Sequence, residues 1–517
     1  MGILSLLILI PLIGSAVVSF VPTSPTRSKQ LALLFTAAAF VVGVIAFLQF
    51  DPAGEQFQLI ENYTWIPALG VSFALGVDGL GLVMIFLATL LTPLVILAGW
   101  NDVEDAAIQN GADESEGQVR GYFGLMLLMQ AMTLTVFLAL DVFLFYFIFE
   151  AVLIPVYFMI GRYGVGRRTY AAVKFLVYSL AGGLVMLAGL AVLWFASVQV
   201  TGEPNLYLPD LIDIDIDPTL QTWIFWAFFI AFAIKAPLWP LHTWLPDASG
   251  SATPGTAILL IGVLDKLGTF GMLRFCLPLF PEAAQSAAPV IVVLSLISIF
   301  YGGLLAIGQT DMKRMFGYVS LSHFGFIILG IFVFTTQAQV GSAFYMLGHG
   351  LSTALLFMVA GYMIARRHTS TISEYHGLST PTPVLAGMML FAGLTALALP
   401  GMSTFVSEFL VLLGTFVRNP WVGAIATLGI ILAAVYILLF YQNTMTGKVT
   451  EKNKSLKDLN LRERVALAPI VVVVVVLGFY PAPVLDVLNP YVDDVMAQVG
   501  TTDPPPVVPL ATEGAQP

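Results

Sequence analysis

Apolar runs long enough to cross a membrane recur along almost the whole chain. Each is roughly 18 to 28 residues long, and about 20 apolar residues in a helix span a hydrocarbon core of about 30 Å. With 58% hydrophobic and 10% charged residues, a chain of 517 residues has too few polar side chains to cover a water-soluble globule. The short segments of alternating polarity that mark a membrane β-barrel are absent from the sequence. The sequence therefore predicts an all-α, polytopic membrane protein.

These runs predict about fourteen transmembrane helices. The first run could be mistaken for a signal peptide, but it lacks a charged start and is long enough to span, so we expect a helix there. The predicted spans lie near residues 2–21, 31–50, 78–99, 121–139, 141–160, 171–198, 221–238, 254–275, 287–308, 314–333, 341–365, 383–418, 421–443 and 463–483.

The distribution of positive charge predicts the orientation in the membrane. If the N-terminus is outside, seventeen of the 21 lysines and arginines fall in cytoplasmic loops or adjoining helix ends, and only Arg274 and Arg418 fall outside. Because lysine and arginine are enriched in cytoplasmic loops, both termini are expected on the external side of the cell membrane. Lys235 and Lys266 belong to neither side, since each lies within an apolar run.

Proline breaks two of the predicted helices. The seventh carries Pro237 and Pro240 in the segment AFAIKAPLWPLHTWLPD, and the twelfth carries Leu399-Pro400-Gly401. The breaks are five spans apart, and an odd offset gives opposite topology, as in inverted-repeat transporters whose working site lies at such breaks. We therefore expect helices 4–8 and 9–13 to form two inverted five-helix repeats.

The chain divides accordingly into four parts. We expect an N-terminal three-helix segment with an acidic loop, two five-helix repeats, and a final part with a basic cytoplasmic loop, the last helix and a disordered proline-rich tail. These parts cover residues 1–120, 121–275, 287–443 and 444–517.

Six ionisable side chains lie within six different predicted helices. An unpaired charge at the centre of a membrane costs at least about 2.5–3.5 kcal/mol, so such groups face the interior of the bundle and pair with one another or line water. One pair could be a structural tie, whereas six in six helices indicate a route for protons. The six are Glu150, Lys235, Lys266, His323, His349 and Glu408.

Glu150 and Lys235 are expected to form a coupled pair. Glu150 has aromatic neighbours and no charge near it in sequence, so it needs a cation from another helix. Burial and a nearby carboxylate act in opposite directions on the proton affinity of a lysine, so movement of Glu150 would switch Lys235. Pro237 should leave carbonyls near residue 233 without helical donors and admit water beside Lys235. A permanent tie, or a kink without function, are the alternatives.

Four further residues are secondary candidates. Lys174 lies opposite His349 when the two repeats are matched, and His242 lies just beyond the first break. Asp265 precedes Lys266, and because adjacent residues on a helix point about 100° apart, it is expected to pair with another helix or chain. Asp141, like Asp78, lies near a membrane boundary, where helix capping is the favoured interpretation.

The sequence argues against several other classes of site. Cys276 is the only cysteine, which excludes a disulfide, a thiolate iron–sulfur cluster or a cysteine zinc site within the chain. The five histidines have no metal-binding spacing, and no glycine-rich phosphate loop follows a strand. A net charge of −10 argues against nucleic-acid binding. No cofactor or metal is expected in this chain.

Several long segments together resemble a known family. FIFEAVLIP, FAIKAPLWPLHTWLPDA, LDKLGTFGMLRF and GQTDMKRMFGYVSLSHFGF are similar to segments of the antiporter-like membrane subunits of respiratory complex I, and the resemblance runs from about 70 to 445. The chain looks most like subunit M, the mitochondrial subunit-four type. Glu408 stands where the sibling subunits L and N carry lysine, and the long lateral helix of subunit L is not expected here.

The resemblance implies a function. Glu150 and Lys235 resemble the coupling pair, Lys266 the central relay, His323 and His349 the bridging groups, and Glu408 the exit residue. Electrons would pass from NADH to quinone through FMN and iron–sulfur clusters in partner subunits, with L and N as neighbours in the bilayer, while this chain moves protons outward. A subunit of a multi-subunit sodium/proton antiporter or a membrane hydrogenase is the alternative. A non-transporting scaffold is an alternative of another class.

Overall fold

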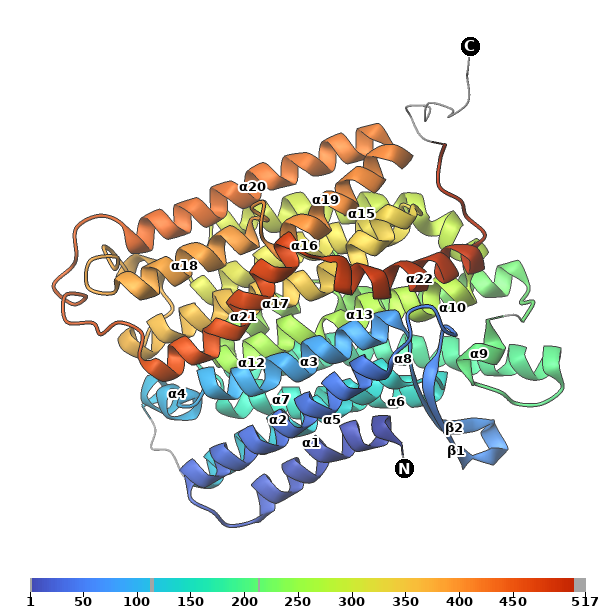
Figure 1. Cartoon of the computed structure of the whole chain (residues 1–517), viewed down its shortest axis with the longest axis horizontal. Coiled ribbons are helices and arrows are strands. Elements are labelled where there is room, and N and C mark those ends of the chain that lie inside the picture. The colour runs from blue at the N-terminus through green and yellow to red at the C-terminus, as the bar shows by residue number, and fades with distance from the viewer. Residues whose placement is uncertain (1, 112–115, 213, 506–517) are drawn as a thin grey trace.

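The helices of this protein run side by side from one end of the molecule to the other (Figure 1). The computed structural model describes residues 2–111, 116–212 and 214–505. In these ranges, 12 helices are long and apolar enough to cross a membrane, or 13 when the bent pair α21 and α22 is taken as one span. The prediction of an all-α membrane fold is confirmed. The predicted span 383–418 is divided into two shorter helices, which that criterion does not count as a span.

The secondary structure begins and ends as follows. The helices are α1 (Ile3–Phe20), α2 (Pro25–Gln49), α3 (Gly79–Ala98), α4 (Asp102–Asn110), α5 (Glu116–Leu138), α6 (Val142–Ala151), α7 (Leu153–Tyr163), α8 (Arg168–Thr201), α9 (Leu208–Leu211), α10 (Pro218–Lys235), α11 (Trp244–Ser251), α12 (Pro254–Leu259), α13 (Lys266–Gly271), α14 (Leu277–Leu279), α15 (Pro281–Ile307), α16 (Met312–Phe332), α17 (Thr336–Arg367), α18 (Pro383–Ala396), α19 (Ser403–Arg418), α20 (Pro420–Met445), α21 (Leu461–Phe479) and α22 (Ala482–Val499). The strands are β1 (Gln58–Ile66) and β2 (Val71–Val77).

Polar side chains cap the N-termini of many helices by accepting hydrogen bonds from the free amide groups of the first turn. Asp78 accepts from Gly81 N at the start of α3, and Asp311 accepts from Arg314 N at the start of α16. Asn460 and Glu463 form a reciprocal capping box at the start of α21. Because the first turn of a helix has amides without intrahelical partners, these caps fix where each apolar run enters the membrane.

A β-hairpin that the sequence analysis did not predict lies between α2 and α3. Strands β1 and β2 pair antiparallel, and Gly70, with φ of 66°, closes the connection between them. Glu61 of β1 accepts hydrogen bonds from the amides of Leu4 and Ser5 at 2.8 and 3.1 Å. A carboxylate at the N-terminus of a helix is favourable because it satisfies amides and opposes the helix dipole. The hairpin therefore anchors α1.

Both proline breaks have the same pattern of backbone hydrogen bonds. After α10, the amide of Leu238 donates to Ala233 O at 3.0 Å, and after α18 the amide of Leu399 donates to Leu394 O at 3.0 Å. A side chain takes the next carbonyl in each case: Trp244 Nε1 bonds Ile234 O, and Thr404 Oγ1 bonds Thr395 O. The two breaks therefore have the same local geometry, while the two inverted repeats and their boundaries stay predictions.

The two ends of the bundle carry different elements. Figure 1 places the N-terminus, the hairpin and α9 at one end, which we call the terminal face. The α1–α2 connection, α4 and the long α20–α21 connection lie at the other end, which we call the loop face. The predicted basic loop 448–464 therefore belongs to the loop face.

The last span is followed by a helix that was not predicted. Helix α21 ends at Phe479, and α22 continues at an angle of 67° to it. Buried apolar residues of α22, such as Val492 and Val495, form its inner face. Within the expected proline-rich tail, residues 506–517 lie outside the described part of the chain.

Candidate functional site

Lys266 and His349 form the centre of a buried polar line. Lys266 follows a π-helical stretch, Leu260–Leu264, and its Nζ lies 2.7 Å from His349 Nδ1 and 2.5 Å from Ile261 O. Lys266 is 0% exposed, and the ring of Phe324 lies 5.1 Å from its Nζ. The widened turn leaves the Ile261 carbonyl able to accept from the lysine, as π-bulges do at many functional sites. The two predicted residues are therefore in direct contact.

His323 continues the line from His349. The two imidazole ring centres lie 5.3 Å apart. His349 Nε2 lies 3.1 Å from Ser320 Oγ and 3.3 Å from Thr353 Oγ1, while His323 Nε2 lies 3.2 Å from Tyr436 Oη. Both imidazoles thus have hydroxyl partners, and a neutral imidazole can accept a proton on one nitrogen and donate from the other.

A tyrosine connects this group to the predicted exit residue. Tyr345 Oη donates to Glu408 Oε2 at 2.8 Å, and the Tyr345 ring centre lies 5.8 Å from that of His323. Glu408 lies in the second turn of α19, after the second break, and is 5% exposed. The structure therefore brings Lys266, His349, His323 and Glu408 together in one continuous cluster.

The hydroxyl groups of this cluster were not predicted from the sequence. Tyr345, Tyr436 and Ser320 each contact one of the predicted ionisable residues. A tyrosine within an apolar helix usually packs through its ring, so its type alone carries little signal. Tyr345 could have been found from its spacing, because it precedes His349 by four residues and so shares its helix face.

Glu150 and Lys235 are close enough to interact but do not touch. Neither carboxylate oxygen of Glu150 nor Nζ of Lys235 has a hydrogen-bond partner among the described residues. The Lys235 ammonium instead lies 4.8 Å from the ring centre of Phe149 and 5.8 Å from that of Phe175. Aromatic faces attract a cation, which partly compensates for the missing anion. The expected contact between the two charges is therefore open in this structure.

Asp265 lies between the two lysines of the site. Asp265 is close enough to Lys235 and Lys266 to interact electrostatically with both, although neither of its oxygens has a hydrogen-bond partner among the described residues. Gly268, one turn later, allows this close approach, because a Cβ there would overlap Phe232 O and the amide of Ala236. Asp265 thus lies near α10. Of the two expected neighbours, another helix or another chain, the structure shows another helix of the same chain.

The sequence predicted free carbonyls at the break beside Lys235. In the structure, these carbonyls accept hydrogen bonds. Pro237 removes the usual donor to Ala233 O, but the amide of Leu238 replaces it. The indole of Trp244 donates to Ile234 O at 2.9 Å. The expectation was wrong because residues after the break turn back and supply donors, which sequence periodicity does not reveal.

Lys174 and His242 lie apart from the buried line. Lys174 Nζ forms an ion pair with Asp247 Oδ2 at 2.7 Å, and Arg314 contacts the other oxygen. Burial opposes the charge of Asp247, but these hydrogen bonds outweigh it and hold the pKa of Asp247 below its usual range. The His242 ring packs edge-on against Tyr301, 5.1 Å between centres.

Asp141 and Asp78 both cap helices, in agreement with the favoured interpretation. Asp141 Oδ1 accepts from the amides of Phe143 and Leu144 at the start of α6. Asp78 caps α3 and also forms an ion pair with Arg274 at 2.6 Å, in which both side chains are almost wholly buried. The described residues contain no cluster of three or more His, Cys, Asp or Glu side chains placed to hold a metal ion.

Comparison with known proteins assigns this arrangement to a family. The profile described as "NADH:quinone oxidoreductase/Mrp antiporter, TM" matches residues 139–433, which include all six predicted residues. The chain belongs to this family. The NADH-quinone oxidoreductase subunit M of Mycobacterium tuberculosis H37Rv is 44% identical over 99% of this chain and 97% of its own length. The predicted resemblance to subunit M is thereby confirmed.

One solved structure supports the assignment to this family, and a second shows the same fold. A chain of respiratory complex I from Thermus thermophilus with bound NADH superposes with a TM-score of 0.86 and 31% identity, over 96% of this chain and 100% of that chain. A chain of the Mrp complex from Dietzia sp. has a TM-score of 0.82 at 19% identity, over 96% and 98% of the two chains. The second likeness shows the shared fold alone.

Proposed function

We propose that this chain is a proton-translocating membrane-arm subunit of an NADH:quinone oxidoreductase. The observation that carries the proposal is the buried line from Lys266 through His349, His323 and Tyr345 to Glu408. Charged groups within a membrane are costly and face pathways for ions or protons. The names of the Mycobacterium relative and of the Thermus assembly supply the context of NADH oxidation and quinone reduction.

The line offers a sequence of proton transfers. Charged Lys266 donates to His349 Nδ1 over 2.7 Å and becomes a neutral amine. The proton then passes from His349 to His323, where ring rotation or a bridging water spans the 5.3 Å between ring centres. Tyr436, on His323 Nε2, and Tyr345, on Glu408 Oε2, supply the hydroxyl groups for the last transfer. Glu408 releases the proton toward the exit.

Glu150 and Lys235 supply the coupling to other subunits. Movement of Glu150 toward Lys235 would stabilise the ammonium charge and draw it away from the rings of Phe149 and Phe175. Asp265 interacts with both lysines, so the change at Lys235 alters the stability of the charge on Lys266. The redox chemistry, with FMN and iron–sulfur clusters, takes place in partner subunits, and antiporter-like L and N subunits are the neighbours.

The chain lies in the cell inner membrane with the loop face in the cytoplasm. This orientation follows from the enrichment of lysine and arginine at that face. Protons therefore enter from the cytoplasm and leave at the terminal face, where both termini are external. The two inverted repeats supply one broken helix on each side of the central lysine.

Substitution of Lys235 and Glu408 tests this function. In the whole complex reconstituted into vesicles, the Lys235→Ala and Glu408→Ala variants should still assemble. The number of protons translocated per NADH oxidised should fall, because each substitution removes one ionisable side chain of the proposed pathway. Lys448→Ala, at an exposed loop position, is the control. Unchanged proton ratios in both variants contradict the proposal, and loss of sodium rather than proton movement supports the antiporter alternative.

A further inference from the structure

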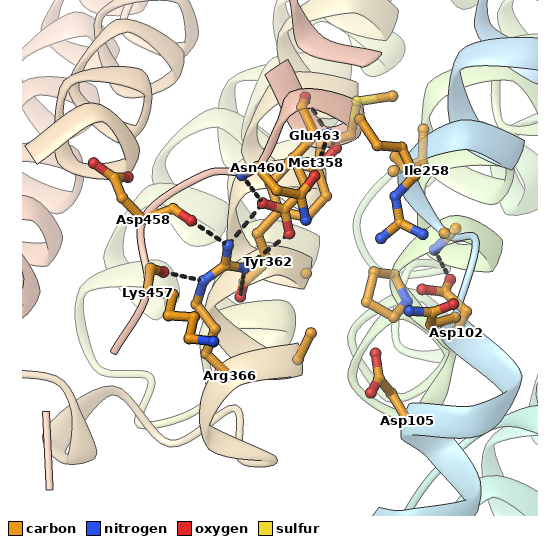
Figure 2. Close-up of a pocket in the computed structure, with 18 residues that line it drawn as sticks. Asp102, Asp105, Ile258, Met358, Tyr362, Arg366, Lys457, Asp458, Asn460 and Glu463 are labelled. Atoms are coloured by element: carbon orange, nitrogen blue, oxygen red, sulfur yellow. Dashed lines mark hydrogen bonds and ion pairs between the residues drawn. The ribbon is translucent and has the colours of Figure 1, made fainter. Parts of the chain in front are cut away.

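A polar pocket of about 350 Å³ opens among the helix ends of the loop face (Figure 2). Figure 2 shows Arg366 and Glu463 on one wall, joined by hydrogen bonds, and Asp102 and Asp105 on the opposite wall. Arg366 contacts both carboxylate oxygens of Glu463, at 2.9 and 2.7 Å. Arg366 and Glu463 therefore neutralise each other, whereas Asp102 on the opposite wall accepts a hydrogen bond from the amide of Gly255.

Asp102 and Asp105 titrate close to neutral pH. Burial raises the pKa of Asp102 to about 6, although the amide of Gly255 and the hydroxyl of Tyr122 lower it. Burial, Asp102 and Glu104 raise the pKa of Asp105 to about 7, against the opposing charges of Arg462 and Lys29. Lys313 also acts on Asp102. Groups with such values change protonation readily at the pH of a cell.

The direct way from this pocket to Lys266 is closed. Ile258 of α12 and Met358 of α17 line the pocket. Further in, the π-helical stretch Leu260–Leu264 that follows α12 touches α17 through its backbone, because a Cβ on Gly350 would lie 2.7 Å from Gly262 O and from Leu87 of α3. This contact lies next to His349 and four residues before Lys266.

A second way runs along the other side of α12. Asp102 Oδ2 accepts from Gly255 N at 2.7 Å and lies 3.4 Å from Tyr122 Oη. Tyr122 Oη lies 2.7 Å from Thr253 Oγ1 and 3.1 Å from Thr256 Oγ1. All of these side chains are buried. A connected set of hydroxyl groups thus begins at the pocket and enters the first turn of α12.

A small cavity continues this set one turn further in. It has a volume of about 10 Å³, close to the least that one water molecule needs, and lies between α3, α5 and α12. Leu259 and Val263 line it from the helix that carries Lys266, and Gln130 and Thr133 line it from α5. Both side-chain atoms of the Gln130 amide and Thr133 Oγ1 have no hydrogen-bond partner among the described residues.

Unpartnered groups of this kind indicate a ligand. Gln130 is 4% exposed and Thr133 is 1% exposed, so bulk water does not reach them. A buried polar atom without a partner costs about 1–3 kcal/mol, and such atoms in native proteins are usually satisfied by ordered water. The cavity ends at Val263, three residues before Lys266.

We propose that the seam formed by Asp102, Tyr122, Thr253, Thr256, Gln130 and Thr133 is a proton-entry route from the loop-face pocket to Lys266. This inference rests on the proposed function. Asp102 takes a proton from the cytoplasm and releases it to the hydroxyl set. Hydroxyl groups and one water in the cavity pass protons onward, each breaking one O–H bond as another forms. The neutral amine of Lys266 gains the proton and becomes ammonium.

A double substitution in α5 tests the route. Gln130→Leu with Thr133→Val removes the unpartnered polar atoms of the cavity while keeping similar side-chain volume, and leaves Thr92, whose hydroxyl bonds Ala88 O. Thr135→Val is the matched control, because Thr135 lies on the same helix, is buried, and bonds only the carbonyl of its own helix at Ala131. Lys266→Ala is the reference for loss of the relay itself. The readout is protons translocated per NADH oxidised by the whole complex in vesicles.

The expected result is a loss of proton translocation in the double variant as large as that of Lys266→Ala, with the control at the parental value. Asp102→Asn should reproduce that loss at the mouth of the route. Parental translocation in the double variant, with loss in Lys266→Ala, overturns the entry route and leaves the proposed function intact. Parental translocation in Lys266→Ala overturns the proposed function.

Discussion

At the scale of single residues, a glycine determines where the Glu150 carboxylate can lie. A Cβ on Gly183 of α8 would overlap the carboxylate of Glu150, so only glycine leaves it room. The neighbouring Gly182 lets α10 approach closely, because a Cβ added at this glycine would lie 2.8 Å from Ile234 Cδ1. Helix α8 therefore contacts the Glu150 carboxylate at Gly183 and contacts α10, the helix of Lys235, at Gly182. The pair is positioned without a direct contact between its two charges.

Gly183→Ala is expected to displace the Glu150 carboxylate. Overpacking a buried site costs about 1–3 kcal/mol, and here the movable atoms are those of Glu150. The protons translocated per NADH oxidised should fall while the complex still assembles. Gly387→Ala in α18 is the control, because a Cβ there meets nothing within 4 Å and alanine favours the helix by up to about 1 kcal/mol. A parental proton ratio in Gly183→Ala would show that the carboxylate position does not matter.

At the scale of elements, the buried charges occur at irregular points of their helices. Glu150 lies beside the junction of α6 and α7, Lys235 is the last residue of α10, and Lys266 follows the π-helical stretch. Glu408 lies nine residues after Leu399, whose amide closes the second break, and Asp247 lies nine residues after Leu238 at the first. At both breaks, donors from residues after the break satisfy carbonyls that a regular helix would pair within itself. Irregular backbone at this depth is tolerated where it is buried in protein in this way.

Trp244 stabilises the first break, and Trp244→Phe should weaken it. The phenylalanine ring can still pack on Phe175, which lies 5.2 Å from the indole, but Ile234 O loses its donor. A buried carbonyl left unpaired costs about 1–3 kcal/mol, so the midpoint of thermal unfolding should fall. Trp223→Phe, at a position 73% exposed on α10, should leave it unchanged. Equal midpoints for both variants would exclude this role for the indole.

At the scale of the whole molecule, the two faces of the bundle differ in the elements they carry. The loop face has the basic connection after α20 and the acidic α4, whereas the terminal face has the hairpin and α9 (Figure 1). Helix α4 contributes Asp102 and Asp105 to the loop-face pocket. Residues 102–110 of the expected acidic loop therefore lie at the mouth of the bundle.

Single cysteines test which face is cytoplasmic. Cys276 is fully buried, so a membrane-impermeant thiol reagent should label only an introduced, exposed cysteine. Glu203→Cys at the terminal face should react in intact cells, and Lys452→Cys at the loop face should react only in inverted vesicles. The reverse pattern would place the loop face outside and reverse the direction of the proposed route.

The sequence by itself determined the membrane fold, the breaks and the ionisable residues of the candidate site. Long apolar runs permit only helices, because the bilayer offers no hydrogen-bond partners to the backbone. Within such runs, Lys266, His349 and Glu408 are conspicuous because an ionisable side chain is costly to place inside a membrane. Proline marks the breaks. These signals are local, because each can be read within a single helix.

Only the tertiary structure decided which of these residues meet and what lies between them. Tyr345 joins Glu408 to the histidines, Gly183 seats Glu150, and Gln130 and Thr133 form a seam beside α12. The types of these residues alone do not show which of them contact one another. Their roles depend on which helix faces pack together, and side-chain packing between distant helices is not encoded in the period of any one of them.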